Sequence, residues 1–558
     1  MIIAFLILIP PRITGEIVDH LVTHTLTANF LIVKVLQIVM VAIAIYFLRF
    51  LWRISLYGAS YRLASYLRSH IYQHLTLMAP SFFRQYPAGD LMSRVTSDVS
   101  AIEMTAGEGV LSLVDGAMTG IVVLSMLLFF VSWKLTLVAL LPWPFMAYAM
   151  WQFGRSLHSR FAVSQAALGS LTRFVEETLS GIRMVKAFGL EVQKTEAFAE
   201  VVVAASSANR AVSQIDAKYE PTIFLTIALS FLLATLGGAW LIHKGELTLG
   251  ALTSFSMYLS YLIWPMFAFG WVLNIIERGN VAFLRVQTLL NTLPEIKDEG
   301  KKTTMTDSVI RFDIERFAYG VEAPSKVVLE DVRFEIAVGS FLGITGPTGS
   351  GKSTLIALLL RREEAVDARV FLGGEEIRVY PLQLLRDAIA CVTQEPFLFS
   401  VSIAENIALG KPTASLDEIK KAAEMAAIHD DIEAFNDQYH TLVGEKGVTL
   451  SGGQKQRISI ARAILMNAPI LILDNALSAV DIETERRVLL NLKQYRKNRT
   501  MIVISHRLSS LEYADNILVL SSGRVIEHGK HAELRKLNGW YERIYQYQQL
   551  ERQVEAGT

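Results

Sequence analysis

The chain has 558 residues, of which 52% are apolar and only 19% are charged. A soluble domain carries about 25% charged residues, so this composition excludes a single soluble enzyme domain. Basic and acidic residues both number 53, so the formal net charge is zero, which argues neither for nor against a nucleic-acid partner. No basic tract resembles a nucleic-acid surface, so we expect no such partner.

The first apolar stretch, residues 2–9, is followed by Pro10 and Pro11. It has about half of the roughly 20 residues that a membrane-spanning helix needs. It is a poor signal peptide, because no basic region precedes it and no small-residue cleavage site follows it. We expect it to be the outer half of a first transmembrane helix whose beginning lies outside this sequence.

Longer apolar runs follow in the first half of the chain, and each approaches or exceeds the length of a membrane span. They cover residues 31–52, 110–133, 135–153, 221–243 and 252–276. So many runs in one chain argue against soluble core helices. Together with the first segment, they predict about six transmembrane helices.

Basic residues indicate which connections face the cytoplasm. The long connections 53–109 and 154–220 carry repeated arginines and lysines, whereas the short connections near Lys134 and Lys244 carry one basic residue each. By the positive-inside rule, the long connections are cytoplasmic and the short ones face outward. The long connections contain few glycines or prolines, so we expect them to be helical extensions of the transmembrane helices.

Two features of the membrane half leave alternatives open. Asp115 lies within an apolar run, where an acid is costly and often functional, but water or a neighbouring helix near the cytoplasmic end would satisfy it, and we favour that structural role. The last membrane helix is rich in aromatic and methionine side chains, which would either line a cavity for amphipathic molecules or face lipid and other helices. These side chains are Met257, Tyr258, Tyr261, Trp264, Met266, Phe267, Phe269 and Trp271.

The sequence pattern changes after the membrane half. Residues 291–308 are polar and predict a linker. From residue 309, short β-branched runs alternate with helical stretches, which is typical of an α/β domain with a largely parallel sheet. Cys391 is the only cysteine, so no intramolecular disulfide forms, and its apolar neighbours predict a small buried strand residue. We therefore divide the chain into a transmembrane domain (1–290), the linker (291–308), a soluble domain (309–550) and a polar tail (551–558).

A nucleotide-binding loop opens the soluble domain. Residues 346–354 lie between an apolar strand and a helical run, which is the context that a P-loop requires. Glycines let backbone N–H groups close around phosphates, Lys352 neutralises their charge, and the Ser353 hydroxyl coordinates magnesium. The expected ATP-binding residues of this loop are Gly346, Pro347, Thr348, Gly349, Ser350, Gly351, Lys352, Ser353 and Thr354.

A second motif departs from the pattern expected of an ATP-hydrolysing site. Residues 470–474 read as a buried strand that ends in Asp474, and such a strand delivers its acid to magnesium. The next residue normally polarises the attacking water, but here it is Asn475. An amide is a poor proton acceptor, so we expect this site to bind ATP and to hydrolyse it poorly.

Residues 450–457 read Leu-Ser-Gly-Gly-Gln-Lys-Gln-Arg, and with this octapeptide the chain resembles the ABC transporter superfamily. In that superfamily two nucleotide-binding domains enclose two ATP molecules. The resemblance implies that this octapeptide, the signature, completes the ATP site of a partner subunit. Its expected ligand-binding residues are Ser451, Gly452, Gly453 and Gln454. A hydroxyl and backbone amides before a helix suit this role, because the helix dipole lies behind them.

The remaining family elements occur in the expected order. Tyr319 matches the aromatic residue that stacks on adenine, although Gly320 stands where a proline is common. Gln394 matches the glutamine that reaches magnesium and the attacking water. Asp481 matches a loop that communicates between the two sites, and His506 matches the histidine that contacts the terminal phosphate. The resemblance therefore implies that Gln394, Asn475 and His506 occupy the catalytic positions.

The membrane half is similar to that of the family's exporters, which have six helices and short cytoplasmic coupling helices. We expect those coupling helices at residues 93–102 and 180–188. Within the superfamily, the chain most resembles bacterial multidrug resistance-like (Mdl) half-exporters over essentially its whole length. The phrases that carry this resemblance lie at residues 80–83, 89–94, 263–266 and 443–448. It implies an α-helical membrane domain followed by an α/β P-loop ABC nucleotide-binding domain.

The leading hypothesis is an ATP-driven exporter subunit in a bacterial inner membrane, with ATP and Mg²⁺ as cofactors and an amphipathic small molecule as cargo. Asn475 favours a heterodimer with a different half-transporter, because a homodimer would lack the general base at both sites, which typically costs about 10²–10⁴ in rate. An ATP-gated regulatory or channel-like protein is the alternative from another class. A lipid or peptide exporter differs only in its cargo.

Overall fold

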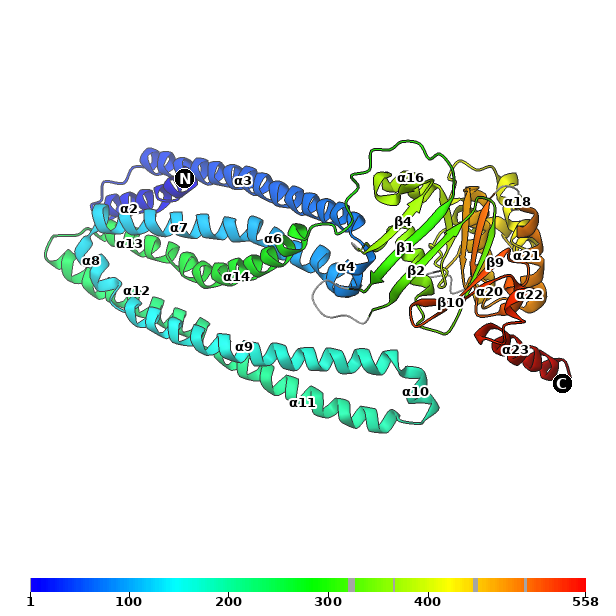
Figure 1. Ribbon diagram of the computed structural model, residues 1–558. Helices are drawn as coiled ribbons and strands as arrows, with labels where there is room; N and C mark the ends of the chain where they lie inside the picture. The colour runs from blue at the N-terminus through cyan, green and yellow to red at the C-terminus, as the bar shows by residue number, and fades with distance from the viewer. Residues whose placement is uncertain (1, 320–326, 365–366, 445–449, 496–498, 558) are drawn as a thin grey trace. The chain divides into compact units, whose positions relative to one another are not determined.

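The computed structural model describes residues 2–319, 327–364, 367–444, 450–495 and 499–557 (Figure 1). Internal contacts divide the chain into two compact units. The first unit comprises Met1–Gln73 and Leu91–Asn291, and the second comprises His74–Asp90 and Thr292–Thr558. Gly320, which departs from the family pattern, and residues 445–448, which contribute to the family resemblance, lie outside the described residues.

The first unit opens with two short helices, α1 (Ile2–Leu6) and α2 (Ile9–Val22). Pro10 and Pro11 stand in the first turn of α2, where a backbone N–H has no partner within the helix. The prolines after the first apolar stretch therefore begin a helix.

Long helices form the rest of the first unit. α3 (Ala28–Leu77) runs without a break, which at 1.5 Å per residue is about 75 Å. It confirms that the first part of the long connection 53–109 is a helical extension of the apolar run 31–52. Three helical stretches among the described residues are long and apolar enough to cross a membrane. They are Ala28–Leu77, Ala88–Val131 and Glu191–His243.

Two of the predicted spans are interrupted. The run 135–153 breaks between α8 (Trp133–Ala139) and α9 (Trp143–Ser180), because Pro142 and Pro144 begin a new helix there. The run 252–276 breaks between α13 (Leu249–Tyr261) and α14 (Ile263–Asn291), where a proline stands in the first turn of α14.

The first predicted coupling helix was misplaced. Residues 93–102 lie within one continuous helical stretch, where Asp98 forms a 3.1 Å ion pair with Arg285 of α14. The stretch consists of α5 (Ala88–Ser93), η1 (Arg94–Asp98), α6 (Val99–Met104), η2 (Thr105–Gly109), α7 (Val110–Ser125) and η3 (Met126–Val131), in which the η segments are π-helical turns. The short separate helix is α4 (Pro80–Gln85), which belongs to the second unit.

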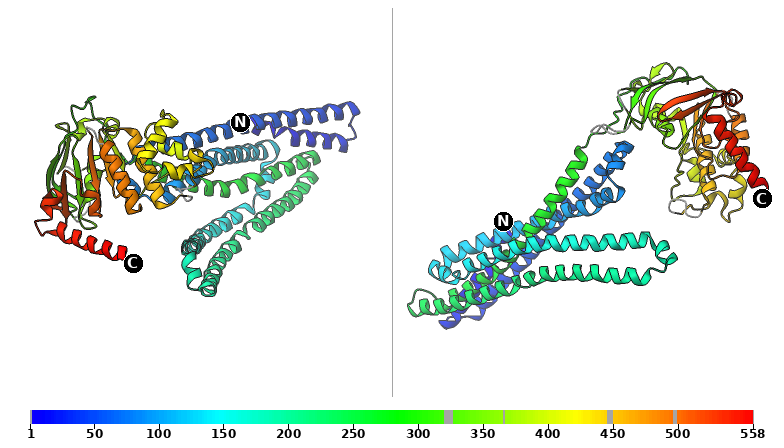
Figure 2. Two further views of the ribbon diagram at one scale, coloured as in Figure 1. Left: turned by 90° about the vertical axis from the view of Figure 1, so that its right-hand side faces the viewer. Right: turned by 60° about the horizontal axis from the view of Figure 1, so that its bottom comes forward.

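The second predicted short helix is confirmed. α10 (Ile182–Ala187) joins α9 to α11 (Glu191–Asp216), and α9 and α11 lie side by side as a long hairpin (Figures 1 and 2). The chain then returns through α12 (Tyr219–His243). At the opposite end from α10, Lys134 and Glu246 form a 2.7 Å ion pair, so both short connections lie at the same end of this unit.

Close backbone packing joins α2 to α13. A Cβ at Gly250 would lie 2.0 Å from the Gly15 carbonyl oxygen, so only glycine fits at this crossing. Tyr258 is fully buried, and its hydroxyl donates to the Leu8 carbonyl oxygen at 2.6 Å, so this residue of the aromatic-rich segment packs between helices. Trp264 is 50% exposed, and Asp115 is half-buried on α7.

The second unit contains two sheets. An antiparallel sheet has the order β2-β1-β4-β5, and a six-stranded sheet has the order β10-β9-β3-β8-β7-β6. The strands are β1 (Ile310–Phe317), β2 (Leu329–Ile336), β3 (Phe341–Thr345), β4 (Ala368–Leu372), β5 (Glu375–Glu376), β6 (Ile389–Val392), β7 (Ile470–Asp474), β8 (Thr500–Ile504), β9 (Asn516–Ser521) and β10 (Arg524–Gly529). All pairings from β9 to β6 are parallel, which confirms the predicted parallel sheet, whereas the sequence analysis missed the antiparallel one.

The second unit also contains further helices and short 3₁₀ turns, in which the 3₁₀ turns carry the label η (Figure 1). They are α15 (Lys352–Leu359), η4 (Ile377–Val379), α16 (Leu382–Asp387), α17 (Ile403–Ala408), α18 (Leu416–Met425), α19 (His429–Glu433), η5 (Gln438–His440), α20 (Gly452–Met466), α21 (Ile482–Tyr495), η7 (Leu508–Leu511), α22 (His531–Leu534) and α23 (Trp540–Gly557). Strands β3, β7 and β8 are buried on both faces, as the continuous apolar runs predicted. Cys391 is half-buried on β6, and burial raises the pKa of its thiol to about 11.

Candidate functional site

The expected site residues follow four neighbouring strands of the parallel sheet. The P-loop follows β3, His506 follows β8, Asp474 ends β7 and Gln394 follows β6. These strands lie in the order β3-β8-β7-β6. Because the carboxyl ends of parallel strands meet at one edge, where such sheets bind ligands, the topology brings these motifs together.

The P-loop wraps tightly around its own lysine. Lys352 is buried, and its Nζ donates to the carbonyl oxygens of Gly346 at 3.0 Å and Pro347 at 2.8 Å. Gly346 and Gly351 have φ angles of 142° and 98°, which side-chain-bearing residues rarely adopt. The loop therefore gathers backbone N–H groups and one cation before α15, as a phosphate site requires.

Lys352, Asp474 and His506 influence one another electrostatically. Burial lowers the pKa of Lys352, and the Asp474 carboxylate partly offsets this shift. Burial also raises the pKa of Asp474, against opposing contributions from a Ser353 hydrogen bond and from Lys352. Burial and the Lys352 charge lower the pKa of His506, so its imidazole is neutral at pH 7.

Asp474 has the features of a magnesium ligand. It is 6% exposed, and its Oδ1 has no hydrogen-bond partner among the described residues. Burying a carboxylate oxygen without a partner is costly, unless a cation occupies the site during function. With the neighbouring Ser353 hydroxyl and the Gln394 amide, the donor set is the oxygen-rich one that Mg²⁺ prefers.

Asn475 lies in the cavity at the same sheet edge. The cavity has a volume of about 190 Å³, and its lining includes Gln394, Asn475 and His506. Asn475 is 8% exposed and has a φ of 48°, and its backbone N–H donates to the Ile504 carbonyl oxygen at 2.9 Å. Asparagine tolerates this left-handed conformation better than most residues with a side chain. The structure thus brings together the three residues expected at the catalytic positions.

Tyr319 is held by two side chains. Its hydroxyl lies 3.0 Å from the Thr354 hydroxyl in the first turn of α15. The Arg84 guanidinium lies 5.2 Å from its ring centroid, within cation–π distance, and pairs with Glu363 at 2.7 Å. Sequence reasoning missed Arg84 and Glu363, because their sequence distance from Tyr319 gives no sign of this contact.

The signature begins helix α20. Ser451 caps the helix in a capping box, in which its hydroxyl accepts from the Gln454 N–H at 3.3 Å and its N–H donates to Gln454 Oε1 at 3.0 Å. None of the residues that line the Asn475 cavity belongs to the signature. The role of Ser451, Gly452, Gly453 and Gln454 at a partner's ATP site stays a prediction.

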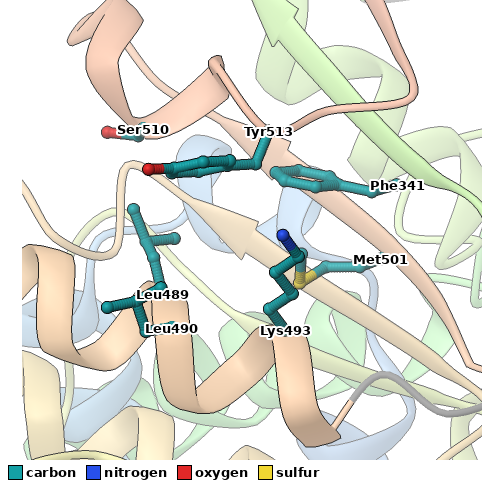
Figure 3. Close-up of a pocket in the computed structure, with 7 residues that line it drawn as sticks. All are labelled: Phe341, Leu489, Leu490, Lys493, Met501, Ser510 and Tyr513. Carbon is teal, nitrogen blue, oxygen red and sulfur yellow. The ribbon is translucent and has the colours of Figure 1, made fainter.

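A smaller pocket lies at the other end of the parallel sheet (Figure 3). Phe341 starts β3, Met501 lies on β8, and Lys493 of α21 has its Nζ 5.1 Å from the Tyr513 ring centroid. The cavity of about 10 Å³ has room for about one water molecule. It is too small for a nucleotide, and we assign it no ligand.

Comparisons with known proteins agree with this arrangement. Residues 1–266 match the family model described as "ABC transporter transmembrane region", and residues 329–478 match the one described as "ABC transporter". The multidrug resistance-like ATP-binding protein MdlA of Escherichia coli K12 is 44% identical over 99% of this chain and 93% of that protein. The probable multidrug resistance ABC transporter YheI of Bacillus subtilis is 38% identical over 98% of this chain and 94% of that protein.

Two further proteins extend the comparison. An ATP-dependent lipid A-core flippase of Syntrophus aciditrophicus is 34% identical over 88% of this chain and 82% of that protein. The structure of a bacterial Atm1-family ABC exporter with ATP bound has a TM-score of 0.81 and 26% identity, and the match covers 98% of both chains. With its membrane helices followed by an ATPase domain, the chain belongs to the ABC transporter superfamily, among the ATP-driven exporters related to the Mdl proteins.

Proposed function

We propose that this chain is one half of a heterodimeric exporter and that its own site holds ATP without appreciable turnover. The observation that carries the proposal is Asn475, an amide at the end of β7 in the cavity that it shares with Gln394 and His506. Among the described residues that line this cavity, Glu485 is the one carboxylate, and it is paired with Arg507 at 2.6 Å. A general base typically contributes about 10²–10⁴ to a rate, so a site without one binds and barely hydrolyses.

ATP binding at this site rests on residues other than Asn475. The P-loop, residues 346–354, surrounds the phosphates with backbone N–H groups and Lys352, and Tyr319 stacks on the adenine. Ser353, Gln394 and Asp474 would hold Mg²⁺, which neutralises phosphate charge. The neutral His506 imidazole donates a hydrogen bond to the terminal phosphate.

The signature serves the partner's ATP. Ser451, Gly452, Gly453 and Gln454 are not among the described residues that line the Asn475 cavity, and the helix dipole of α20 favours an anion at its first turn. The partner supplies a P-loop and its own general base. This division explains how a chain with Asn475 supports hydrolysis in a dimer.

We propose an amphipathic small molecule as the cargo and the bacterial inner membrane as the location. Relatives with 38–44% identity carry multidrug resistance names, and Trp264 and Trp271 are half-exposed side chains suited to varied apolar ligands. A lipid cargo is the second candidate, because lipid A-core flippases are 33–35% identical. Stimulation of the ATPase by lipophilic drugs or by lipid A-core separates the two.

Two measurements test the heterodimer. The full chain, tagged in its own cells, should co-purify with a second half-transporter that has a glutamate after its magnesium-binding aspartate. Photoaffinity trapping with labelled ATP should then find uncleaved nucleotide at this chain's P-loop. Purification of this chain only with itself, or rapid formation of ADP at its P-loop when the partner's site is disabled, would reject the proposal.

A further inference from the structure

Three charged side chains meet within the membrane half of the chain. Arg12 and Glu16 lie one turn apart on α2, and Lys34 lies near the start of α3. The Glu16 carboxylate pairs with the Lys34 ammonium at 2.6 Å and with the Arg12 guanidinium at 3.5 Å. One carboxylate therefore serves two cations, and these three residues, the Arg12 cluster, carry an excess of one positive charge.

The Arg12 cluster lies deep along its helix. Asp19 accepts from the Gly250 N–H at 2.7 Å, so the end of α2 at Val22 is next to the short connection that precedes α13. At 1.5 Å per residue, Arg12 lies about 15 Å from Val22 along the helix axis. That distance is about half of the roughly 30 Å thickness of the hydrocarbon core, so Arg12 stands near the middle of the membrane.

Arg12 is the accessible cation of the cluster. Its side chain is 70% exposed, whereas that of Lys34 is 21% exposed. The neighbouring face of α2 is covered, because Pro11 and Gly15 are buried and the Ser254 hydroxyl of α13 donates to the Pro11 carbonyl oxygen at 2.8 Å. The guanidinium of Arg12 therefore lies beside the packed face of α2 and not within it.

The carboxylates of α2 leave the charge of Arg12 largely uncompensated. Asp19 is already satisfied, since it accepts from the Thr248 hydroxyl at 2.8 Å and from the Gly250 N–H. Among the described residues, Glu16 is the one carboxylate that forms an ion pair with Arg12, and Glu16 also pairs with Lys34. A cation at this depth is costly against lipid, so Arg12 must face water-filled space or meet an anion.

Apolar side chains precede the exposed guanidinium. Ile2 and Phe5 lie on α1, directly before α2, and both are exposed. A cation beside exposed apolar surface suits a molecule that has an anionic group and an apolar body. A guanidinium binds a carboxylate, a sulfonate or a phosphate through paired N–H donors, which a neutral molecule cannot match.

We propose that Arg12 binds the anionic group of the cargo, so that the exporter selects amphipathic molecules with one negative charge. This inference rests on the proposed cargo class, an amphipathic small molecule, and narrows that class by charge. Glu16 sets the number of charges, because it offsets one of the two cations and leaves one to be neutralised by the cargo. A cationic amphiphile is disfavoured at the same place.

The test measures binding of two probes to the purified full-length dimer in nanodiscs of phosphatidylcholine, a lipid without net charge. Dansyl-aminoundecanoic acid is an amphipathic anion, and its primary amide has the same apolar body without the charge. Energy transfer from the protein's tryptophans to the dansyl group reports binding. We expect the acid to bind at least about tenfold more tightly than the amide, because its hydrogen bonds to Arg12 are charge-assisted.

Variants assign this preference to the Arg12 cluster. Arg12→Gln should weaken binding of the acid by about tenfold and binding of the amide by less than about twofold. Arg12→Lys should retain most of the preference, because it keeps the charge. Glu16→Gln should strengthen binding of the acid, because both cations then lack their carboxylate. Lys244→Gln is the matched control, since it removes the same charge from an exposed side chain in a short connection and should change neither affinity.

A second set of nanodiscs contains phosphatidylglycerol, whose headgroup carries one negative charge. If this headgroup occupies the Arg12 cluster, the difference in acid binding between the natural chain and Arg12→Gln should disappear, which assigns the site to an anionic lipid. A difference that persists assigns the site to a lipophilic anion that is not a membrane lipid. Thermal unfolding of every variant checks that the fold is retained.

Two results would overturn the proposal. The first is equal affinity of the natural dimer for the acid and the amide. The second is equal acid affinity of Arg12→Gln and Lys244→Gln. If Arg12→Gln separates into single chains while the preference for the acid is unchanged, Arg12 pairs with an acid across the subunit interface and does not bind cargo.

The proposed function fails by different results. Equal binding of both probes leaves an amphipathic cargo and rejects only its charge, whereas an ATPase that lipophilic drugs fail to stimulate rejects the amphipathic cargo itself. Probe binding requires no hydrolysis. Its outcome therefore depends neither on the role of Asn475 nor on whether the dimer contains two different chains.

Discussion

Asn475 combines a backbone conformation that suits asparagine with a side chain that does not suit hydrolysis. Its φ of 48° is in the left-handed region, where most residues with a Cβ are strained by about 1–2 kcal/mol and asparagine by less. Any substitution here therefore has two effects: one on the backbone and one on the chemistry.

The first prediction separates these effects. Asn475→Glu adds a carboxylate to a cavity that already holds Gln394 and His506, and Asn475→Gln adds the same length without the charge. With the partner's own glutamate removed and its signature intact, Asn475→Glu should raise ATP turnover by at least about tenfold, a modest share of what a general base contributes. Asn475→Gln should give no rise. If the two variants have equal turnover, something besides the missing base disables the site.

The second prediction concerns Asp474. Its buried carboxylate suits Mg²⁺ binding but lowers the stability of the nucleotide-free fold. The pKa of Asp474 in the folded chain is raised above its unfolded value of about 3.9. At a pH between these two pKa values, the folded state therefore binds more protons than the unfolded state. The contribution of Asp474 to the free energy of unfolding falls as the pH rises from the unfolded pKa through the folded pKa. At pH 7 the buried, charged carboxylate of Asp474 therefore lowers the free energy of unfolding. Asp474→Asn should therefore raise the melting temperature of the nucleotide-free protein by about 2–4 °C for each kcal/mol gained.

Asp481 is the control for this prediction, because its pKa is shifted in the opposite direction. Asp481 accepts from the Thr484 N–H at 2.9 Å, which lowers its pKa, so its charge stabilises the fold at pH 7. Asp481→Asn should leave the melting temperature unchanged or lower it. With Mg²⁺ and ATP present, Asp474→Asn should lose its advantage, because only the natural residue gains from the ligand. Differential scanning calorimetry at pH 7 with and without nucleotide checks both statements.

At the scale of elements, the sequence predicts the elements whose residues are required by local chemistry. The glycines of the P-loop and the acid at the end of β7 are visible in the sequence, because their chemistry demands those residues at those positions. The position of α4 is not visible, because Phe82 becomes buried and Pro80 and Pro87 become boundaries only in the folded unit. Likewise Arg84 meets Tyr319, and Gln456 meets Ala479, through contacts between residues that are distant in the sequence.

The third prediction compares two elements, the signature turn of α20 and the end of β7. Gly452→Leu places a bulky side chain at the face expected to close on the partner's nucleotide and should abolish ATPase activity of the heterodimer. Asn475→Ala changes only the site that we propose to hydrolyse poorly, and it should have a much smaller effect. Steady-state ATPase of the purified dimer measures both. The reverse ranking would mean that the active and degenerate sites have been exchanged in our assignment.

At the scale of the whole molecule, the short, weakly basic connections and the long, basic hairpin lie at opposite ends of the first unit. Lys134 and Glu246 bring the short, weakly basic connections to one end of the first unit, and α10 closes the basic hairpin at the other end. The apolar window of α3 is not buried at all within this chain, so lipid and other membrane helices must cover it. The positive-inside rule then predicts that α10 lies in the cytoplasm.

The fourth prediction tests this orientation by cysteine labelling. The natural background is low, because Cys391 is half-buried and burial raises its pKa to about 11, so it remains a protonated, slowly reacting thiol at pH 7. Glu246→Cys should react with a membrane-impermeant maleimide in spheroplasts, and its lost surface ion pair costs at most about 1 kcal/mol. Val192→Cys, on a side chain 71% exposed in the first turn of α11, should react only after the membrane is permeabilised. Labelling of Val192→Cys in intact spheroplasts would show that the basic hairpin faces outward and that the charge pattern misorients the chain.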